Sequence, residues 1–355
     1  MTVIETGKAR MPAPGRFEIR RRIAHLYALL IAFNVVVWAI ALLTFRTYPI
    51  LLGTGLLAYT FGLRHAVDAD HIAAIDNVTR KLMQAGKRPI TVGLYFSLGH
   101  SSVVFLASTA IAVTASALET RFRAFKEIGG LIGTAVSAGF LLAIAAANLL
   151  ILVGVYRSFQ RVRQGGRFIE EDLDILLANR GLLGRLFRPI FKLVSKSWHM
   201  YPLGFLFGLG FDTATEIGVL GMSAAGATQG LPIWSILIFP ALFTAAMTLI
   251  DTTDGILMLG AYGWAFVKPI RKLYYNMTIT FVSAVIAAVV GGIEALGIVG
   301  DRLGLDQGFW GVIAALNENF GVLGYLIIAL FGASWIVSVL VYRLKGYDRI
   351  EVTDA

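Results

Sequence analysis

Long apolar segments follow one another along most of this chain, separated by shorter polar connections. A helix needs about 20 predominantly apolar residues to cross the hydrocarbon core of a membrane. Such segments cover residues 24–44, 49–77, 89–117, 128–156, 201–222, 232–262, 273–299 and 309 or 320–342. The pattern therefore predicts an all-α, polytopic membrane protein with about eight transmembrane helices.

The second segment contains a strongly polar stretch, residues 64–72, with the sequence RHAVDADHI. The apolar run before it rises only about 20 Å as a helix, whereas the hydrocarbon core is roughly 30 Å thick. The helix must therefore carry these ionisable residues into the membrane or break there. At about 100° per residue, His65, Asp68 and His71 share one side of a continuous helix, and Asp70 lies almost opposite.

Ionisable side chains at this depth are costly unless they are paired or bound to an ion. The stretch therefore predicts a metal site formed by two imidazoles and a carboxylate on one face of the helix. Arg64 lies on the same side of the helical wheel, where a bound dication would repel it unless an acid neutralises it. We expect Arg64 to pair with Asp68, its nearest acid on the wheel.

Three later segments also carry polar residues at depth. They read FSLGHSSVV at 96–104, LGFDTATE at 209–216 and MTLIDTTDG at 247–255. The acids of the last two lie three or four residues apart, so each pair shares a helix face, and paired carboxylates repel unless a cation or proton lies between them. We expect these helices to surround a hydrated cavity, because such groups face lipid only at high cost. The residues expected to line this path or support the site are Asn34, Arg64, His100, Ser101, Asp212, Thr213, Glu216, Asp251 and Asp254.

The same residues also allow plainer interpretations. A lone buried histidine such as His100, or a single amide such as Asn34, serves helix packing as readily as ion binding. Asp76 and Glu294 lie near predicted helix ends, where we expect them to be solvated. Phe-Gly-Leu precedes both the first acidic cluster, at 61–63, and the second, at 207–209, which is the pattern that an inverted three-helix repeat would leave.

Composition narrows the chemistry of the site. The chain is 57% hydrophobic and 15% charged and contains no cysteine, whereas soluble domains are about a quarter charged. Any metal is therefore held by nitrogen and oxygen ligands, and imidazole with carboxylate suits a divalent first-row transition metal such as nickel, cobalt, zinc or copper. The binding forms are deprotonated, so metal binding should weaken as the pH falls.

The formal net charge of +9 comes from basic residues whose distribution along the chain agrees with the expected topology. Most lysines and arginines lie in the N-terminal arm, the tail and the connections on the same side of an eight-helix chain, so the positive-inside rule places both termini in the cytoplasm. We assign these charges to orientation and lipid headgroups, not to nucleic acid. The expected organisation is a cytoplasmic basic arm (1–23), helices one to four (24–156), a cytoplasmic loop (157–199), helices five to eight (200–342) and a cytoplasmic tail (343–355). No cleavable signal peptide is expected.

The four motifs together resemble the nickel/cobalt transporter (NiCoT) family of high-affinity secondary permeases. RHAVDADHI agrees with the family pattern throughout, and the only departure in the later motifs is Ala246, where glycine is usual. The resemblance implies uptake of Ni²⁺ and/or Co²⁺ as transported substrate, without a cofactor, an enzymatic activity or an ATPase subunit. It also implies a role for Asn34 and the second helix in metal selection. The residues that it implies for metal handling are His65, Asp68, Asp70 and His71.

The helical wheel does not place Asp70 with this implied set, so either the helix unwinds after Asp68 or Asp70 supports the ligands without binding the metal itself. We favour a local break after Asp68, with Gly62 as the hinge. Two other functions remain open. Nickel or cobalt efflux is one, although exporters of that type often carry a long histidine-rich loop and 157–199 holds a single histidine. An intramembrane zinc enzyme is the other, but no HExxH sequence occurs.

Overall fold

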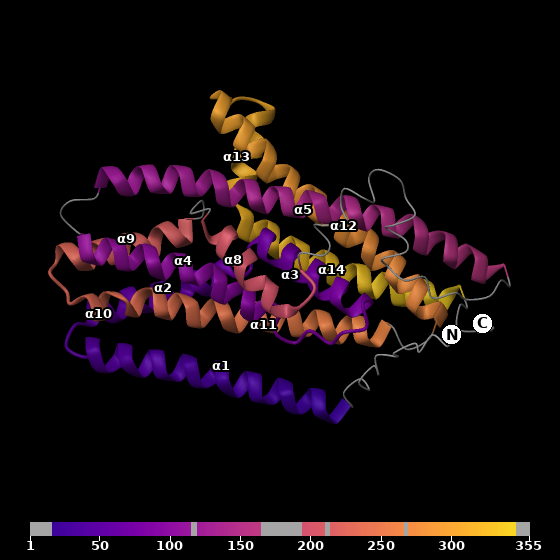
Figure 1. The fold of residues 1–355 in the computed structure, drawn as a ribbon, viewed down its shortest axis with the longest axis horizontal. Helices are drawn as coiled ribbons and strands as arrows, with labels where there is room; N and C mark the ends of the chain where they lie inside the picture. Colours follow the sequence, from indigo (N-terminus) through magenta and orange to yellow (C-terminus); the bar gives the residue numbers. More distant parts are fainter. Residues whose placement is uncertain (1–15, 115–118, 165–193, 210–213, 266–268, 346–355) are drawn as a thin grey trace, which may run out of the picture.

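The computed structural model describes residues 16–114, 119–164, 194–209, 214–265 and 269–345 (Figure 1). Within these ranges the chain is helical and contains no strand, so the all-α prediction is confirmed. The elements are α1 (Arg16–Phe45), α2 (Pro49–His65), α3 (Ala69–Gln84), α4 (Val92–Thr114), α5 (Glu119–Arg163), the 3₁₀ turn η1 (Ser197–His199), α8 (Met200–Gly208), α9 (Ala214–Thr228), α10 (Ile233–Ile236), α11 (Ile238–Ala265), α12 (Pro269–Leu303), α13 (Phe309–Glu318) and α14 (Phe320–Leu344).

Six of the described helices are long and apolar enough to cross a membrane, and α2 with α3 adds a seventh if the bent pair is one span. The polytopic class is therefore confirmed, with six to seven candidate spans where about eight were expected. The expected span 201–222 falls on α8 and α9, with 210–213 outside the described residues. Most of the expected loop 157–199 also lies outside them, and α5 continues into it as far as Arg163.

The centre of the bundle is built around α11. This helix packs on α1, α2, α3 and α4, and α4 packs in turn on α8 and α9. Leu242, Phe243 and Met247 of α11 have no exposed surface, because neighbouring helices cover this stretch from several sides. In Figure 1, α1 runs along one side of this group and α5 along the other, where α5 packs extensively on α12.

The predicted span 49–77 is interrupted beside its ionisable residues. Helix α2 ends at His65 and α3 begins at Ala69, with a bend of 51° between them. Asp68 precedes α3 in an extended conformation (φ −66°, ψ 149°), and its backbone amide donates to the His65 carbonyl at 2.9 Å. The break therefore lies at 66–68, before the position where we expected it.

Gly62 does not act as the hinge of this break. It lies inside α2, where an added Cβ would collide with the carbonyl oxygen of Phe243 and come within 2.9 Å of the Ala246 Cβ. Its missing side chain lets α2 approach α11 closely. The departure from the family pattern at Ala246 thus lies directly in this helix contact.

Candidate metal centre

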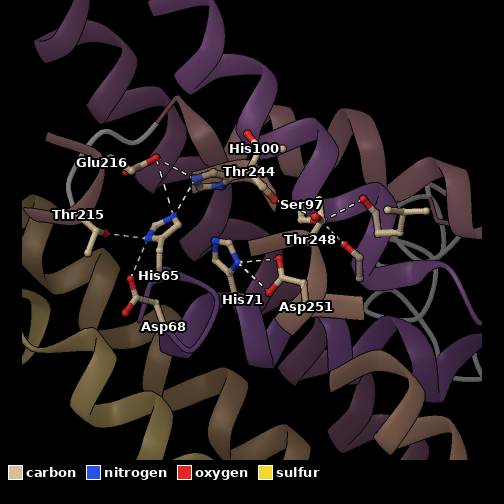
Figure 2. Close-up of polar contacts among 12 residues, drawn as sticks. His65, Asp68, His71, Ser97, His100, Thr215, Glu216, Thr244, Thr248 and Asp251 are labelled. Carbon is tan, nitrogen blue, oxygen red and sulfur yellow. Dashed lines mark hydrogen bonds and ion pairs between the residues drawn. The ribbon is translucent and has the colours of Figure 1, made fainter. Parts of the chain in front are cut away.

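Three imidazole rings converge at the helix break. His65 ends α2, His71 lies in the first turn of α3 and His100 lies within α4. Their ring centroids are 4.7 to 4.8 Å apart, and one ring nitrogen from each lies within 4.8 Å of the other two. Figure 2 shows the rings gathered at the meeting point of their helices. Among the described residues, this trio has the spacing needed to hold a metal ion.

The His65 ring has partners on both nitrogens. Its Nδ1 lies 3.0 Å from Asp68 Oδ2 and 3.3 Å from Thr215 Oγ1, while its Nε2 lies 2.9 Å from His100 Nε2. The break creates the first of these contacts, because it places Asp68 at the head of α3, directly after the end of α2. A carboxylate on Nδ1 fixes the ring orientation and directs Nε2 toward the centre.

The other two rings are held by acids from distant segments. His100 Nε2 lies 2.8 Å from Glu216 Oε1 in α9, and His71 Nδ1 lies 3.3 Å from Asp251 Oδ2 in α11. The same Glu216 oxygen is 4.0 Å from His65 Nε2. Each ring therefore has a carboxylate neighbour, an arrangement that favours a cation between the rings.

Burial completes the case for an ion-binding site. His65, His71 and His100 are 1%, 0% and 2% exposed. In the described part of the chain, His71 Nε2 and His100 Nδ1 are buried atoms with no hydrogen-bond partner. Buried polar atoms are normally satisfied, and a divalent cation that accepts imidazole lone pairs would satisfy atoms of this kind. The arrangement can hold an ion away from bulk water.

Two residues of the 64–72 motif stand apart from this trio. Asp70 is half-buried in the first turn of α3 and interacts electrostatically with His65. Arg64 is exposed, and in the described ranges no ion pair joins it to Asp68, which contacts His65 instead. The expected pairing is wrong. Arg64 lies in α2 and Asp68 directly precedes α3, and because the chain bends between the two helices these residues do not share the face of one continuous helix.

The remaining path candidates have different surroundings. Asn34 is hydrogen-bonded to neighbouring helices: its Nδ2 donates to the Ala245 carbonyl at 3.1 Å, and its Oδ1 accepts from the Tyr59 hydroxyl at 2.9 Å. Ser101 is buried, and its Oγ has no partner among the described atoms. Asp254 lies one turn beyond Asp251, and its Oδ2 also has no partner there. The two remaining candidates, Asp212 and Thr213, lie outside the described residues.

Sequence reasoning missed a second buried polar network, further along α3. Asp76, expected to be solvated, is 0% exposed and accepts hydrogen bonds from Tyr262 and from Ser283 at 2.7 Å. Arg80, one turn further, is 1% exposed and donates to Thr280 at 3.1 Å. The depth of Asp76 depends on α11 and α12, whose positions the local sequence does not reveal.

Glu294 was also wrongly expected to be solvated. It is 2% exposed in α12 and accepts from the hydroxyl of Ser137 in α5 at 2.8 Å. Thr215, next to the predicted Glu216, was not singled out either, although it lies in the same motif. The sequence feature that could have identified Thr215 is its position next to an acid within an apolar segment.

These features define the class as a polytopic helical membrane protein with a buried imidazole and carboxylate centre. The family model described as "High-affinity nickel-transport protein" matches residues 51–341. The chain belongs to this family, which confirms the resemblance seen in its motifs. It is a family of transport proteins, so the chain is not an enzyme.

Similarity to individual proteins extends over nearly the whole chain. A high-affinity nickel transport protein of Cupriavidus necator is 63% identical, covering 97% of each chain. The nickel transporter NixA of Staphylococcus aureus is 47% identical over 91% of this chain and 94% of its own. The cobalt transport protein NhlF of Rhodococcus rhodochrous is 41% identical over 83% and 84%. No solved structure matches the chain significantly.

Proposed function

We propose that this chain is a secondary transporter that imports Ni²⁺, Co²⁺ or both across the cytoplasmic membrane. The observation that carries the proposal is the buried group of His65, His71 and His100 at a helix break, with a carboxylate beside each ring. Imidazole with carboxylate suits divalent nickel or cobalt, and the names of the relatives specify one or the other. The metal is the substrate, and no resident cofactor takes part.

In this proposal the three imidazoles bind the ion and the acids balance its charge. Asp68 keeps the His65 ring in its binding orientation, and Asp70 adds negative charge close to it. The ion then passes along α11, where Asp254 follows Asp251 by one turn. Asp212 and Thr213 remain part of the proposed path on their sequence motif alone.

The burial of the centre supports alternating access. A site that is almost fully enclosed corresponds to an occluded state, and opening to either side requires helices to move around the break. The membrane potential favours inward movement of a dication by about 4.6 kcal/mol per 100 mV. No ATPase subunit is therefore needed to drive uptake.

Location and orientation are part of the same proposal. The excess of lysine and arginine on one set of connections supports a multi-pass protein in the cytoplasmic (inner) membrane with both termini in the cytoplasm. The protein contacts lipid and its metal ion, and it does not bind nucleic acid.

Accumulation of radioactive nickel, and separately cobalt, in cells expressing the chain tests the proposal. Wild type should accumulate metal above an empty-vector control, and His65→Ala should abolish this because it removes one of three buried imidazoles. His25→Ala is the matched control, since His25 is an exposed histidine of α1 and its loss should leave uptake unchanged.

Whether the cells gain or lose metal relative to the empty-vector control distinguishes uptake from efflux. Cells that hold less metal than the empty-vector control would show efflux and overturn the direction proposed here. Equal loss of uptake in His25→Ala and His65→Ala, at matched membrane levels, would remove the assignment of the centre to α2, α3 and α4.

A further inference from the structure

Helix α14 meets the interrupted backbone of the metal centre at one glycine. Gly324 is buried, and an added Cβ would overlap the carbonyl oxygen of Val67 and lie 3.3 Å from Ile72 Cδ1. Val67 belongs to the non-helical residues 66–68 between α2 and α3. The backbone of α14 therefore rests directly on the break, at a distance that only glycine permits.

Neighbouring residues of α14 strengthen this contact. Phe320 and Ile327 are 6% and 8% exposed and share a core cluster with Ala69 and Ile72 of α3. Other side chains of the helix, such as Leu326, are largely exposed. The helix thus presents one narrow face to the break, and Gly324 lies on that face.

The break needs such a cover for a physical reason. Backbone that leaves a helix within a membrane is tolerated only where protein or water surrounds its polar groups. The Gly324 backbone lies directly against the Val67 carbonyl and so provides protein cover for this polar group. The contact therefore helps to hold residues 66–68 in one conformation.

Val67 directly precedes a residue that orients the metal centre. Asp68 Oδ2 lies 3.0 Å from His65 Nδ1, and this contact turns His65 Nε2 toward His100, 2.9 Å away. A shift of Val67 would move Asp68 with it and change the direction in which His65 presents its nitrogen. Position 324 is therefore coupled to the centre through two successive residues of the break.

We propose that Gly324 is a positioning residue for metal binding: through Val67 it holds the break in the geometry in which Asp68 orients His65. The proposal rests on the proposed function for its choice of metal. It goes beyond that function because it assigns a role to α14, a helix that contributes no side chain to the centre.

The first test compares Gly324→Ala with Gly332→Ala. Gly332 lies in the same helix, but an added Cβ there meets nothing within 4 Å. Gly324→Ala should raise the KM for nickel uptake by about tenfold or more, with the maximal rate per transporter nearly unchanged, while Gly332→Ala keeps the wild-type KM. Equal KM values for the two variants would overturn the proposal.

A double variant separates positioning from general loss of packing. If Gly324 acts through Asp68, Gly324→Ala should weaken uptake no further in an Asp68→Asn background, because the orienting carboxylate is already lost. Additive effects of the two substitutions would contradict this route.

A labelling experiment does not depend on transport at all. The chain has no cysteine, so Ala66→Cys places a single thiol in the break, where Ala66 is 2% exposed. Added Gly324→Ala should raise the rate of maleimide labelling in the purified protein several-fold, and added Gly332→Ala should not. Equal rates would overturn the inference, whereas a wild type without uptake would overturn only the proposed function.

If Gly324→Ala fails to accumulate in the membrane, a second variant that adds no atom can test the same contact. Ile72→Val removes the Cδ1 atom next to Gly324 and loosens the same contact. Faster labelling of Ala66→Cys in this background would support the proposal, and an unchanged rate would refute it.

Discussion

At the scale of single residues, the carboxylate beside each imidazole ring affects how that ring can bind a metal ion. His71 and His100 each have one nitrogen against a carboxylate of another helix, Asp251 and Glu216, and one without a partner among the described residues. On His71, the Asp251 contact at Nδ1 fixes the ring orientation and raises the basicity of the opposite nitrogen. On His100, Glu216 contacts the same Nε2 that faces His65, so it places negative charge directly beside the centre. The acids are therefore as important to the centre as the rings.

Glu216→Gln tests this dependence. The amide has nearly the same shape as the carboxylate but carries no charge and no longer balances a cation between His65 and His100. The KM for nickel uptake should rise about 10–100-fold, as for other ligand-orienting partners. Glu318→Gln, at an exposed position at the end of α13, is the control, and matching KM values for the two variants would contradict the assignment.

At the scale of elements, α3 carries two buried polar groups with different surroundings. Its first turn supplies His71 to the candidate metal centre, and its later turns supply Asp76 and Arg80 to hydrogen bonds with α11 and α12. Asn77 extends this network to α5, since Asn148 donates to its Oδ1 at 2.6 Å. The network ties α3 to three neighbours and fixes the helix that begins at the break.

Asp76→Asn should weaken this tie. The carboxylate accepts from Tyr262 and Ser283 through separate oxygens, whereas an amide offers one oxygen and leaves one buried hydroxyl donor unsatisfied. The expected cost is about 1–3 kcal/mol, measured as a lower apparent melting temperature of the detergent-solubilised protein. Asp301→Asn, at an exposed position of α12, should melt like the wild type. A melting temperature unchanged in both variants would refute a stabilising role for the network.

At the scale of the whole molecule, the centre exists only because four separate parts of the bundle meet. The α2 and α3 pair, α4, α9 and α11 each contribute ring or carboxylate atoms, while α1 and α14 expose many large apolar side chains. An apolar exterior around a polar interior is the arrangement that a membrane protein requires. The bundle thereby keeps charged groups away from lipid.

Cysteine labelling tests the orientation proposed for this bundle. Arg88→Cys lies between α3 and α4, on the expected cytoplasmic side, and Asp306→Cys lies between α12 and α13, on the opposite side; both positions are exposed. A membrane-impermeant maleimide should label Asp306→Cys in intact cells and Arg88→Cys only after permeabilisation. The reverse result would invert the topology.

Much of this protein was determined by its sequence alone. The helical, polytopic class follows from the length of the apolar segments, and the cost of charge in lipid marked His65, Asp68, His71 and Asp251 as candidate functional residues before any fold was known. The four motifs also indicated the family that the comparisons confirm. These conclusions depend on local composition and spacing, which a linear sequence contains in full.

Only the tertiary structure decided how these residues are used. It placed the break at 66–68, turned Arg64 outward, joined His100 to the other two rings and buried Asp76 and Glu294. It also brought Gly324 onto a carbonyl far away in the chain. Each of these outcomes depends on contacts between helices that are distant in sequence, and helical periodicity gives the direction of a side chain but not the neighbour that it meets.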